Sequence, residues 1–134
     1  MSEAKRLTAA DIMTKIVVTS GPNSEITEIA TKMQRNKIGS VVITESRKVI
    51  GIVTERDFVR VIENIGVLLD KNRARHHMTK PVITVESDTS VANVIRLMRE
   101  KNVRHLVVLN KNGELAGIIS SQDLTKATTG DVSQ

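Results

Sequence analysis

The chain has no cysteine, tryptophan or tyrosine, and Phe58 is its single aromatic residue. The absence of cysteine excludes disulfides, thiol catalysis and thiolate metal sites. The scarcity of aromatic rings predicts an aliphatic core and removes the side chains on which single-stranded nucleic acid usually stacks. No uncharged apolar run approaches the ~18 residues of a membrane span, and the first residues carry charge where a signal peptide needs an apolar stretch. We therefore expect a cytoplasmic protein with no membrane segment.

The remaining composition is that of an ordinary globular protein. Of the 134 residues, 40% are hydrophobic and 26% are charged, and the formal net charge is +5. This excess of lysine and arginine favours anionic partners such as phosphate ligands, nucleic acid or an acidic protein surface. Most of these charges are expected simply to solvate the outer faces of helices.

An internal repeat is the main feature of the sequence. Met13-Thr14-Lys15 recurs as Met78-Thr79-Lys80 at a displacement of 65 residues. Gly51-Ile52-Val53-Thr54 recurs as Gly117-Ile118-Ile119-Ser120 at a displacement of 66 residues. The extra residue falls in a turn between two strands, where insertions cost little. The chain therefore consists of two copies, each about half its length.

Within each copy the hydrophobic periodicity changes in the same order. A short strand at 17–19 precedes a helix, because apolar residues recur at i, i+3, i+4 and i+7 from Ile26, and again from Val91 in the second copy. Two strands follow as a hairpin, for which Asn112-Gly113 is a strong turn signal. A last helix in the first copy shows one apolar face, made of Phe58, Ile62, Ile65 and Leu69.

The predicted fold class is α/β (α+β), with strand, helix, strand, strand and helix in each copy. A copy of some 60 residues makes a marginal core, so two copies are expected to pack sheet to sheet with pseudo-twofold symmetry and clefts along the seam. The predicted boundaries are 8–70 for the first repeat, 71–77 for a basic linker, 78–127 for the second repeat and 128–134 for a flexible tail.

One helix of the second copy has a broader apolar face than its counterpart, because Leu97 stands where the first copy has Lys32. The last helix of the second copy is also short of apolar residues. Apolar surface left uncovered in this way favours a homodimer.

The order of elements resembles a tandem pair of CBS domains, also called a Bateman module. The Met-Thr lead-in and two phrases carry the resemblance, Gly51 to Asp57 and Gly117 to Asp123, and it covers residues 8–127. It implies a regulatory module with two potential nucleotide clefts. With no effector domain expected in this chain, the output would pass to an effector protein or through dimer geometry.

The resemblance also implies binding residues. In this family a Thr or Ser and the Asp three residues later hold the ribose or phosphate of an adenosine ligand, which corresponds to Thr54 with Asp57 and Ser120 with Asp123. The chemistry is suitable, since a carboxylate can accept hydrogen bonds from both ribose hydroxyls and a helix start attracts phosphate. The same spacing is typical of a helix cap, and the two roles can coexist. The recurrence in both copies favours the ligand role.

Further residues are implied to complete the pockets. The family often places basic residues where Arg104 and His105 stand, to meet phosphates, while an exposed strand edge is the alternative interpretation. The first copy has Gly39 and Ser40 there, so phosphate binding is expected to be unequal between the copies. The lead-in strands are implied to meet adenine, and they contribute Lys15, Ile16, Lys80, Pro81 and Val82.

The predicted function is a ligand sensor that binds AMP, ADP, ATP or S-adenosylmethionine, with no catalytic cofactor. The alternative is a nucleic-acid-binding or protein-interaction scaffold that uses the basic surface, including residues 71–77. An enzyme is not expected, because a Walker loop and a Ser/His/Asp arrangement are both missing from the sequence. A metal site is not expected either, since adjacent His76 and His77 have no further ligand at a suitable spacing.

Overall fold

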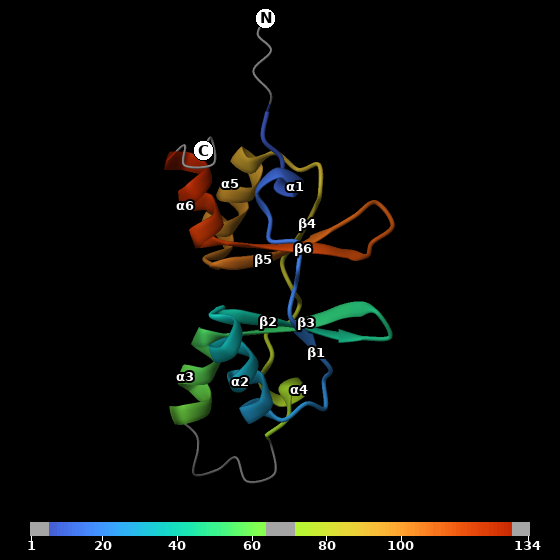
Figure 1. The fold of residues 1–134 in the computed structure, drawn as a ribbon, viewed down its shortest axis with the longest axis vertical. Helices are drawn as coiled ribbons and strands as arrows, with labels where there is room; N and C mark the ends of the chain where they lie inside the picture. The colour runs from blue at the N-terminus through green and yellow to red at the C-terminus, as the bar shows by residue number, and fades with distance from the viewer. Residues whose placement is uncertain (1–5, 64–71, 130–134) are drawn as a thin grey trace, which may run out of the picture. The chain divides into compact units, whose positions relative to one another are not determined.

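The computed structural model describes residues 6–63 and 72–129, and the chain divides into two compact units (Figure 1). The contiguous unit runs from Val17 to Val82. The split unit joins the chain up to Ile16 to the chain from Ile83 onward. The mixed α/β fold class is confirmed, since each unit has one three-stranded sheet with helices on one face. The compact units differ from the sequence copies, because each unit contains the lead-in of the other copy.

The contiguous unit is a sheet of order β1-β2-β3, in which β1 runs parallel to β2 and β2 antiparallel to β3. A two-residue turn joins β2 to β3, and both turn residues have positive φ, 52° at Ser46 and 68° at Arg47, as a tight hairpin requires. Its elements are β1 (Thr19–Ser20), α2 (Ile26–Asn36), β2 (Ser40–Glu45), β3 (Lys48–Thr54), α3 (Glu55–Glu63) and α4 (Ala74–His77).

The core of the contiguous unit forms between α2 and the sheet. The predicted helical stripe is buried here, as Ile26, Ile29 and Met33 pack against β2 and β3. Burial of this apolar stripe is what stabilises a helix of only three turns.

Residues 74–77 depart from the expected basic linker. They fold into α4, and its Ala74 is fully buried in the core of the contiguous unit. The basic side chains around it concealed this role, because a four-residue helix is too short to show a periodicity.

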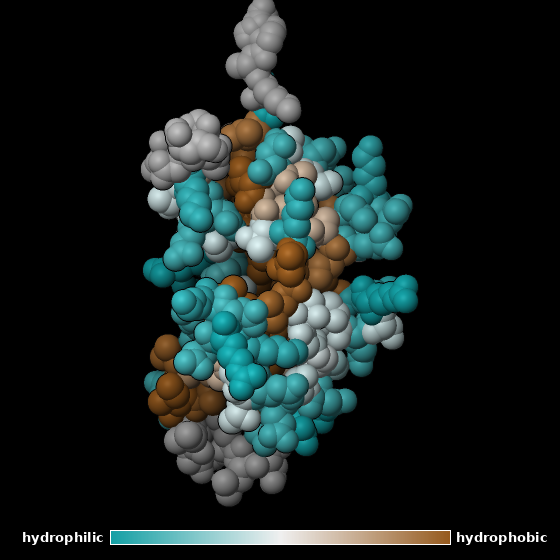
Figure 2. Space-filling model, in the orientation of Figure 1, coloured by the Kyte–Doolittle hydropathy of each residue, from teal (hydrophilic) through white to brown (hydrophobic). Residues whose placement is uncertain are grey.

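The predicted apolar face of α3 is only partly right. Phe58 packs on the core, but Ile62 is 68% exposed and Val61 packs instead. The buried side of the helix therefore follows an i, i+3 spacing rather than i, i+4. Ile65 and Leu69 lie outside the described residues. Exposed Val59 and Ile62 give α3 an apolar outer surface, visible as a brown area in Figure 2.

The split unit repeats the same architecture with sheet order β4-β5-β6. Leu97 packs against its core, so it is not left as unpaired surface, and α6 continues to Thr129, past the predicted end of order at 127. The described helices include none that is long and apolar enough to cross a bilayer. The elements of this unit are α1 (Ala9–Ile12), β4 (Thr84–Glu86), α5 (Val91–Lys101), β5 (His105–Leu109), β6 (Leu115–Ser120) and α6 (Ser121–Thr129).

The two repeated phrases contact each other within each unit. In the split unit Thr14 forms an antiparallel bridge with Ile118, and in the contiguous unit Thr79 forms one with Ile52. Beside these bridges, Met13 packs on Gly117 and Met78 packs on Gly51. The Met-Thr lead-in of one copy is therefore seated on the glycine phrase of the other.

Candidate functional site

Thr54 and Asp57 form the corner where β3 ends and α3 begins. The Asp57 Oδ2 atom accepts hydrogen bonds from the Thr54 backbone N–H at 2.8 Å and from its hydroxyl at 3.3 Å. An acidic residue in the first helical turn satisfies in this way a backbone donor that has no partner inside the helix. The helix-capping interpretation of this spacing is therefore confirmed.

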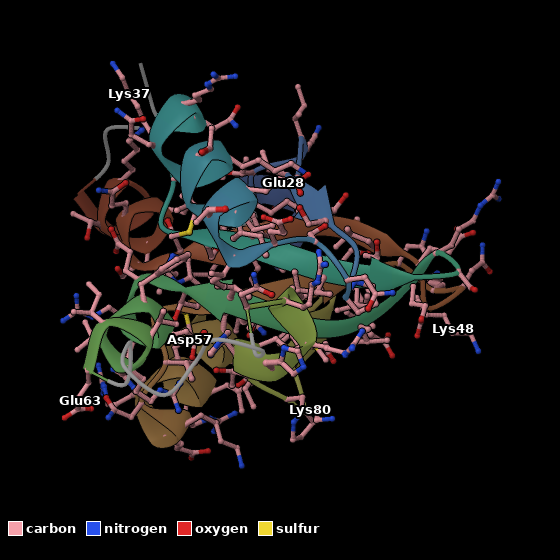
Figure 3. The ribbon with its side chains drawn as sticks, turned by 90° about the horizontal axis from the view of Figure 1, so that it is seen from below. Glu28, Lys37, Lys48, Asp57, Glu63 and Lys80 are labelled. Carbon is pink, nitrogen blue, oxygen red and sulfur yellow. The ribbon has the colours of Figure 1, made fainter. Side chains whose placement is uncertain are left out.

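The Asp57 side chain is 1% exposed, and its second oxygen also has partners. Oδ1 accepts a hydrogen bond from the Thr79 hydroxyl at 2.9 Å and forms an ion pair with the guanidinium of Arg60, one turn later in α3. Figure 3 shows Asp57 on the side of α3 that faces α4, the helix that immediately precedes Met78 and Thr79. Both carboxylate oxygens are thus engaged by the protein.

Ser120 and Asp123 form the matching corner between β6 and α6. Asp123 Oδ2 accepts hydrogen bonds from the Ser120 N–H at 2.9 Å and from its hydroxyl at 3.2 Å. The Asp123 N–H donates back to the Ser120 hydroxyl at 3.3 Å, which completes a reciprocal cap. Asp123 is half-buried, and within the described parts of the chain its Oδ1 accepts no hydrogen bond.

The structure brings Arg104 and His105 to the Asp123 corner. His105 pairs with Ser120 across β5 and β6, and the Arg104 carbonyl accepts a hydrogen bond from the Ser121 N–H at 3.0 Å. The Arg104 side chain is exposed, and that of His105 is half-buried. Two basic residues therefore lie at the start of β5, next to the start of α6.

The Asp57 corner has the same backbone arrangement without those side chains. Ser40 pairs with Thr54, and the Gly39 carbonyl accepts a hydrogen bond from the Glu55 N–H at 3.2 Å. The difference in basic residues that the sequence indicated is therefore a difference between two corners with the same backbone arrangement.

The remaining predicted binding residues come directly after Thr14 and Thr79 in the chain, the two residues that form bridges to the sheets. Lys15 and Ile16 come after Thr14 in the split unit, and both are exposed, Ile16 by 88%. In the contiguous unit Lys80 and Pro81 are exposed and Val82 is half-buried. These exposed residues thus directly follow Thr14, which is bridged to β6, and Thr79, which is bridged to β3. These two strands end at the Asp123 and Asp57 corners.

Thr79 and Arg60 are contacts of Asp57 that sequence reasoning missed. The i, i+3 spacing of Asp57 and Arg60 on one helix was an available signal. Thr79 was visible only as part of the repeated Met-Thr phrase, and nothing local relates it to Asp57. The described residues contain no group of three or more His, Asp or Glu side chains placed to hold a metal ion.

Comparison with known proteins agrees with this geometry. A sequence model of the CBS domain matches residues 9–64 and 74–130. An uncharacterized protein of Methanopyrus kandleri is 40% identical over 121 residues, which are 90% of this chain and 62% of that protein. The chain thus spans less than two thirds of the length of this relative.

Two solved structures show the same fold. A CBS domain protein from Pyrobaculum aerophilum, complexed with AMP, is 32% identical with a TM-score of 0.79, over 88% of this chain and 90% of that one. The CBS domain pair of protein MJ0100, in complex with 5′-methylthioadenosine and S-adenosyl-L-methionine, is 25% identical with a TM-score of 0.85, over 95% and 99% of the two chains. Because the family model covers most of its length, the chain belongs to the CBS-domain family and carries two CBS domains in tandem.

Proposed function

We propose that the chain is a regulatory module and is not itself an enzyme. Its ligand contains adenosine and is one of AMP, ADP, ATP and S-adenosylmethionine. The observation that carries this proposal is the corner at Ser120 and Asp123. There a carboxylate oxygen without a hydrogen-bond partner among the described residues stands at a helix start, beside Arg104 and His105.

The chemistry of this corner suits a nucleotide. A carboxylate can accept hydrogen bonds from a ribose diol, and charge-assisted bonds of this kind contribute about 1.5–3 kcal/mol each. The positive end of the α6 helix dipole and the two basic side chains suit phosphate. In the same unit, Lys15 and Ile16 are the lead-in residues we assign to the adenine side, and Lys80, Pro81 and Val82 are their equivalents in the contiguous unit.

The two similar structures support adenosine as the shared part of the ligand. One was solved with AMP and the other with 5′-methylthioadenosine and S-adenosyl-L-methionine. These compounds have the adenine and the ribose diol in common and differ at the 5′ position. The ribose contact is therefore the part of the proposal that all these ligands share.

Calorimetric titration tests the proposal directly. AMP, ADP, ATP and S-adenosylmethionine are titrated into the protein, with GTP as the control for the base. At least one adenosine compound is expected to bind, and loss of a ribose contact by Asp123→Ala is expected to weaken its affinity roughly 30- to 150-fold, for about 2–3 kcal/mol. Absence of binding by every adenosine compound at millimolar concentration would refute the sensor function.

Two further measurements on the same samples test the absence of catalysis and the route by which ligand binding is passed on. The ligand is recovered after incubation and analysed by chromatography, and chemical conversion would contradict a purely regulatory role. Light scattering with and without ligand measures whether the output passes through a second copy of the chain. An unchanged mass would leave an effector protein as the recipient.

A further inference from the structure

The two corners share a sequence pattern, but their carboxylates are in different states. We propose that Thr79 and Arg60 close the Asp57 corner from within, by occupying the carboxylate positions that a ribose diol requires. Asp57 and its contacts with Thr79 and Arg60, called the latch below, then serve only to hold the contiguous unit together. One ligand binds per chain, at Asp123. This inference rests on the proposed function and specifies which corner carries it out.

The two carboxylates differ in the number of donors they receive. A carboxylate offers about four lone-pair positions on its two oxygens. Asp57 receives the N–H and hydroxyl of Thr54 on one oxygen, and the Thr79 hydroxyl and Arg60 guanidinium on the other. Asp123 receives only its two Ser120 donors among the described residues, both on Oδ2. A ribose diol can therefore bind Asp123 directly but must displace protein donors from Asp57.

The backbone of Thr79 makes this displacement difficult. Its N–H donates to the Ile52 carbonyl at 2.8 Å, and its carbonyl accepts from the Ile52 N–H at 3.1 Å. The hydroxyl is thus held beside Asp57 by a bridge to β3, at a high effective concentration compared with a free ligand. Thr14 makes the matching bridge to Ile118 at 2.8 and 3.0 Å, but among the described residues its hydroxyl makes no hydrogen bond to Asp123.

The basic residues near the two corners also favour Asp123 as the ligand-binding corner. Lys126 stands at the sequence position that matches Arg60, so both helices carry a cation one turn after the Asp. The adjoining strand start differs, with Arg104 and His105 at the Asp123 corner and Gly39 and Ser40 at the Asp57 corner. The corner whose carboxylate is closed also lacks the side chains that would meet a phosphate.

The inference is tested by the stoichiometry of AMP binding and by variants that remove the contacts of Asp57. AMP titrated into the wild-type protein is expected to bind with one equivalent per chain, and Asp123→Asn is expected to weaken that binding roughly 30-fold or more. The double variant Thr79→Val with Arg60→Met removes two donors from Asp57 and is expected to add a second, weaker equivalent. Thr79→Val alone is expected to lower Tm by about 4–10 °C through loss of a hydrogen bond to a buried carboxylate.

Thr14→Val is the matched control, because it makes the same change on the equivalent bridge without touching a carboxylate. It is expected to leave Tm and AMP affinity unchanged. Two equivalents in the wild type, or loss of binding through Asp57→Asn but not Asp123→Asn, would overturn the latch while the sensor function stands. So would a folded double variant that gains no second equivalent.

The remaining outcomes also distinguish the two proposals. If no adenosine compound binds, the proposed function fails, and the latch is decided by whether Thr79→Val lowers Tm more than Thr14→Val. Equal Tm values for these two variants would overturn it. If the double variant does not fold, the wild-type stoichiometry and the Asp123→Asn titration decide whether the latch stands.

Discussion

At the scale of single residues, the repeated glycines are explained by the methionines seated on them. A Cβ atom added to Gly51 would overlap the Met78 sulfur, and one added to Gly117 would overlap the Met13 sulfur. At Gly117 the added atom would also lie 2.9 Å from the Thr14 carbonyl oxygen. The second contact involves backbone that is fixed by its bridge to Ile118.

This difference predicts unequal costs for the same substitution. Gly117→Ala is expected to lower the free energy of unfolding by about 2–3 kcal/mol, because the fixed carbonyl cannot move aside. Gly51→Ala is expected to cost about 1 kcal/mol or less, because the Met78 side chain can change rotamer. Urea denaturation followed by circular dichroism measures both. Equal losses would show that the carbonyl contact is relieved by backbone movement.

The corner residues show how far sequence reasoning reaches at this scale. The cap at Thr54 and Asp57 lies within four residues, so local spacing was enough to predict it, and the structure confirms it. The bond from Thr79 to Asp57 joins segments 22 residues apart, and a threonine hydroxyl has many alternative partners. Local pattern therefore identified the carboxylate but not the donors that distinguish it from Asp123.

At the scale of elements, helices α2 and α5 end in the same way with different residues. Lys37 and Asn102 both have left-handed backbone, with φ of 55° and 54°. The next residues, Ile38 and Val103, donate back to the Met33 and Met98 carbonyls at 3.0 and 3.1 Å. This is a Schellman-type ending, in which glycine or asparagine is favoured and a long side chain is strained.

A reciprocal exchange tests this ending. Lys37→Asn is expected to stabilise the protein by about 0.5–1 kcal/mol, and Asn102→Lys to destabilise it by a similar amount. Both positions are exposed, so the change in backbone preference dominates over lost contacts. Thermal unfolding of the two variants gives the comparison. Shifts of the same sign would indicate that side-chain charge, not backbone conformation, decides stability here.

At the scale of the whole molecule, the sequence predicted the elements better than their assembly. Strand, helix, strand, strand and helix in each copy are confirmed. Helices α1 and α4 were not predicted, because four residues show no periodicity. The exchange of lead-ins was also not predicted, since Met13 and Met78 carry the same phrase and so do Gly51 and Gly117. Either pairing satisfies the repeat, and only the three-dimensional path of the chain decides between them.

The exchange predicts which strands respond to changes in α1 and α4. Ala9 is fully buried in the split unit, and Ala74 is fully buried in the contiguous unit. Ala9→Val is expected to overpack its site by about 1–3 kcal/mol and to speed native-state hydrogen exchange in β5 and β6. Ala74→Val is expected to do the same in β2 and β3. Faster exchange in β2 and β3 for Ala9→Val would place α1 in the other unit.

The divided chain of the split unit also has a consequence for biosynthesis. The contiguous unit has all its strands once Val82 has left the ribosome, whereas residues 6–16 are made before that unit and have no sheet to join until β6 emerges. Domains generally begin to fold as they are synthesised, and contacts between distant segments form slowly because a long loop must close. Residues 6–16 are therefore among the last to reach their final positions, although they are made before the contiguous unit, and a ribosome stalled after β3 would carry α1 without its partner strands.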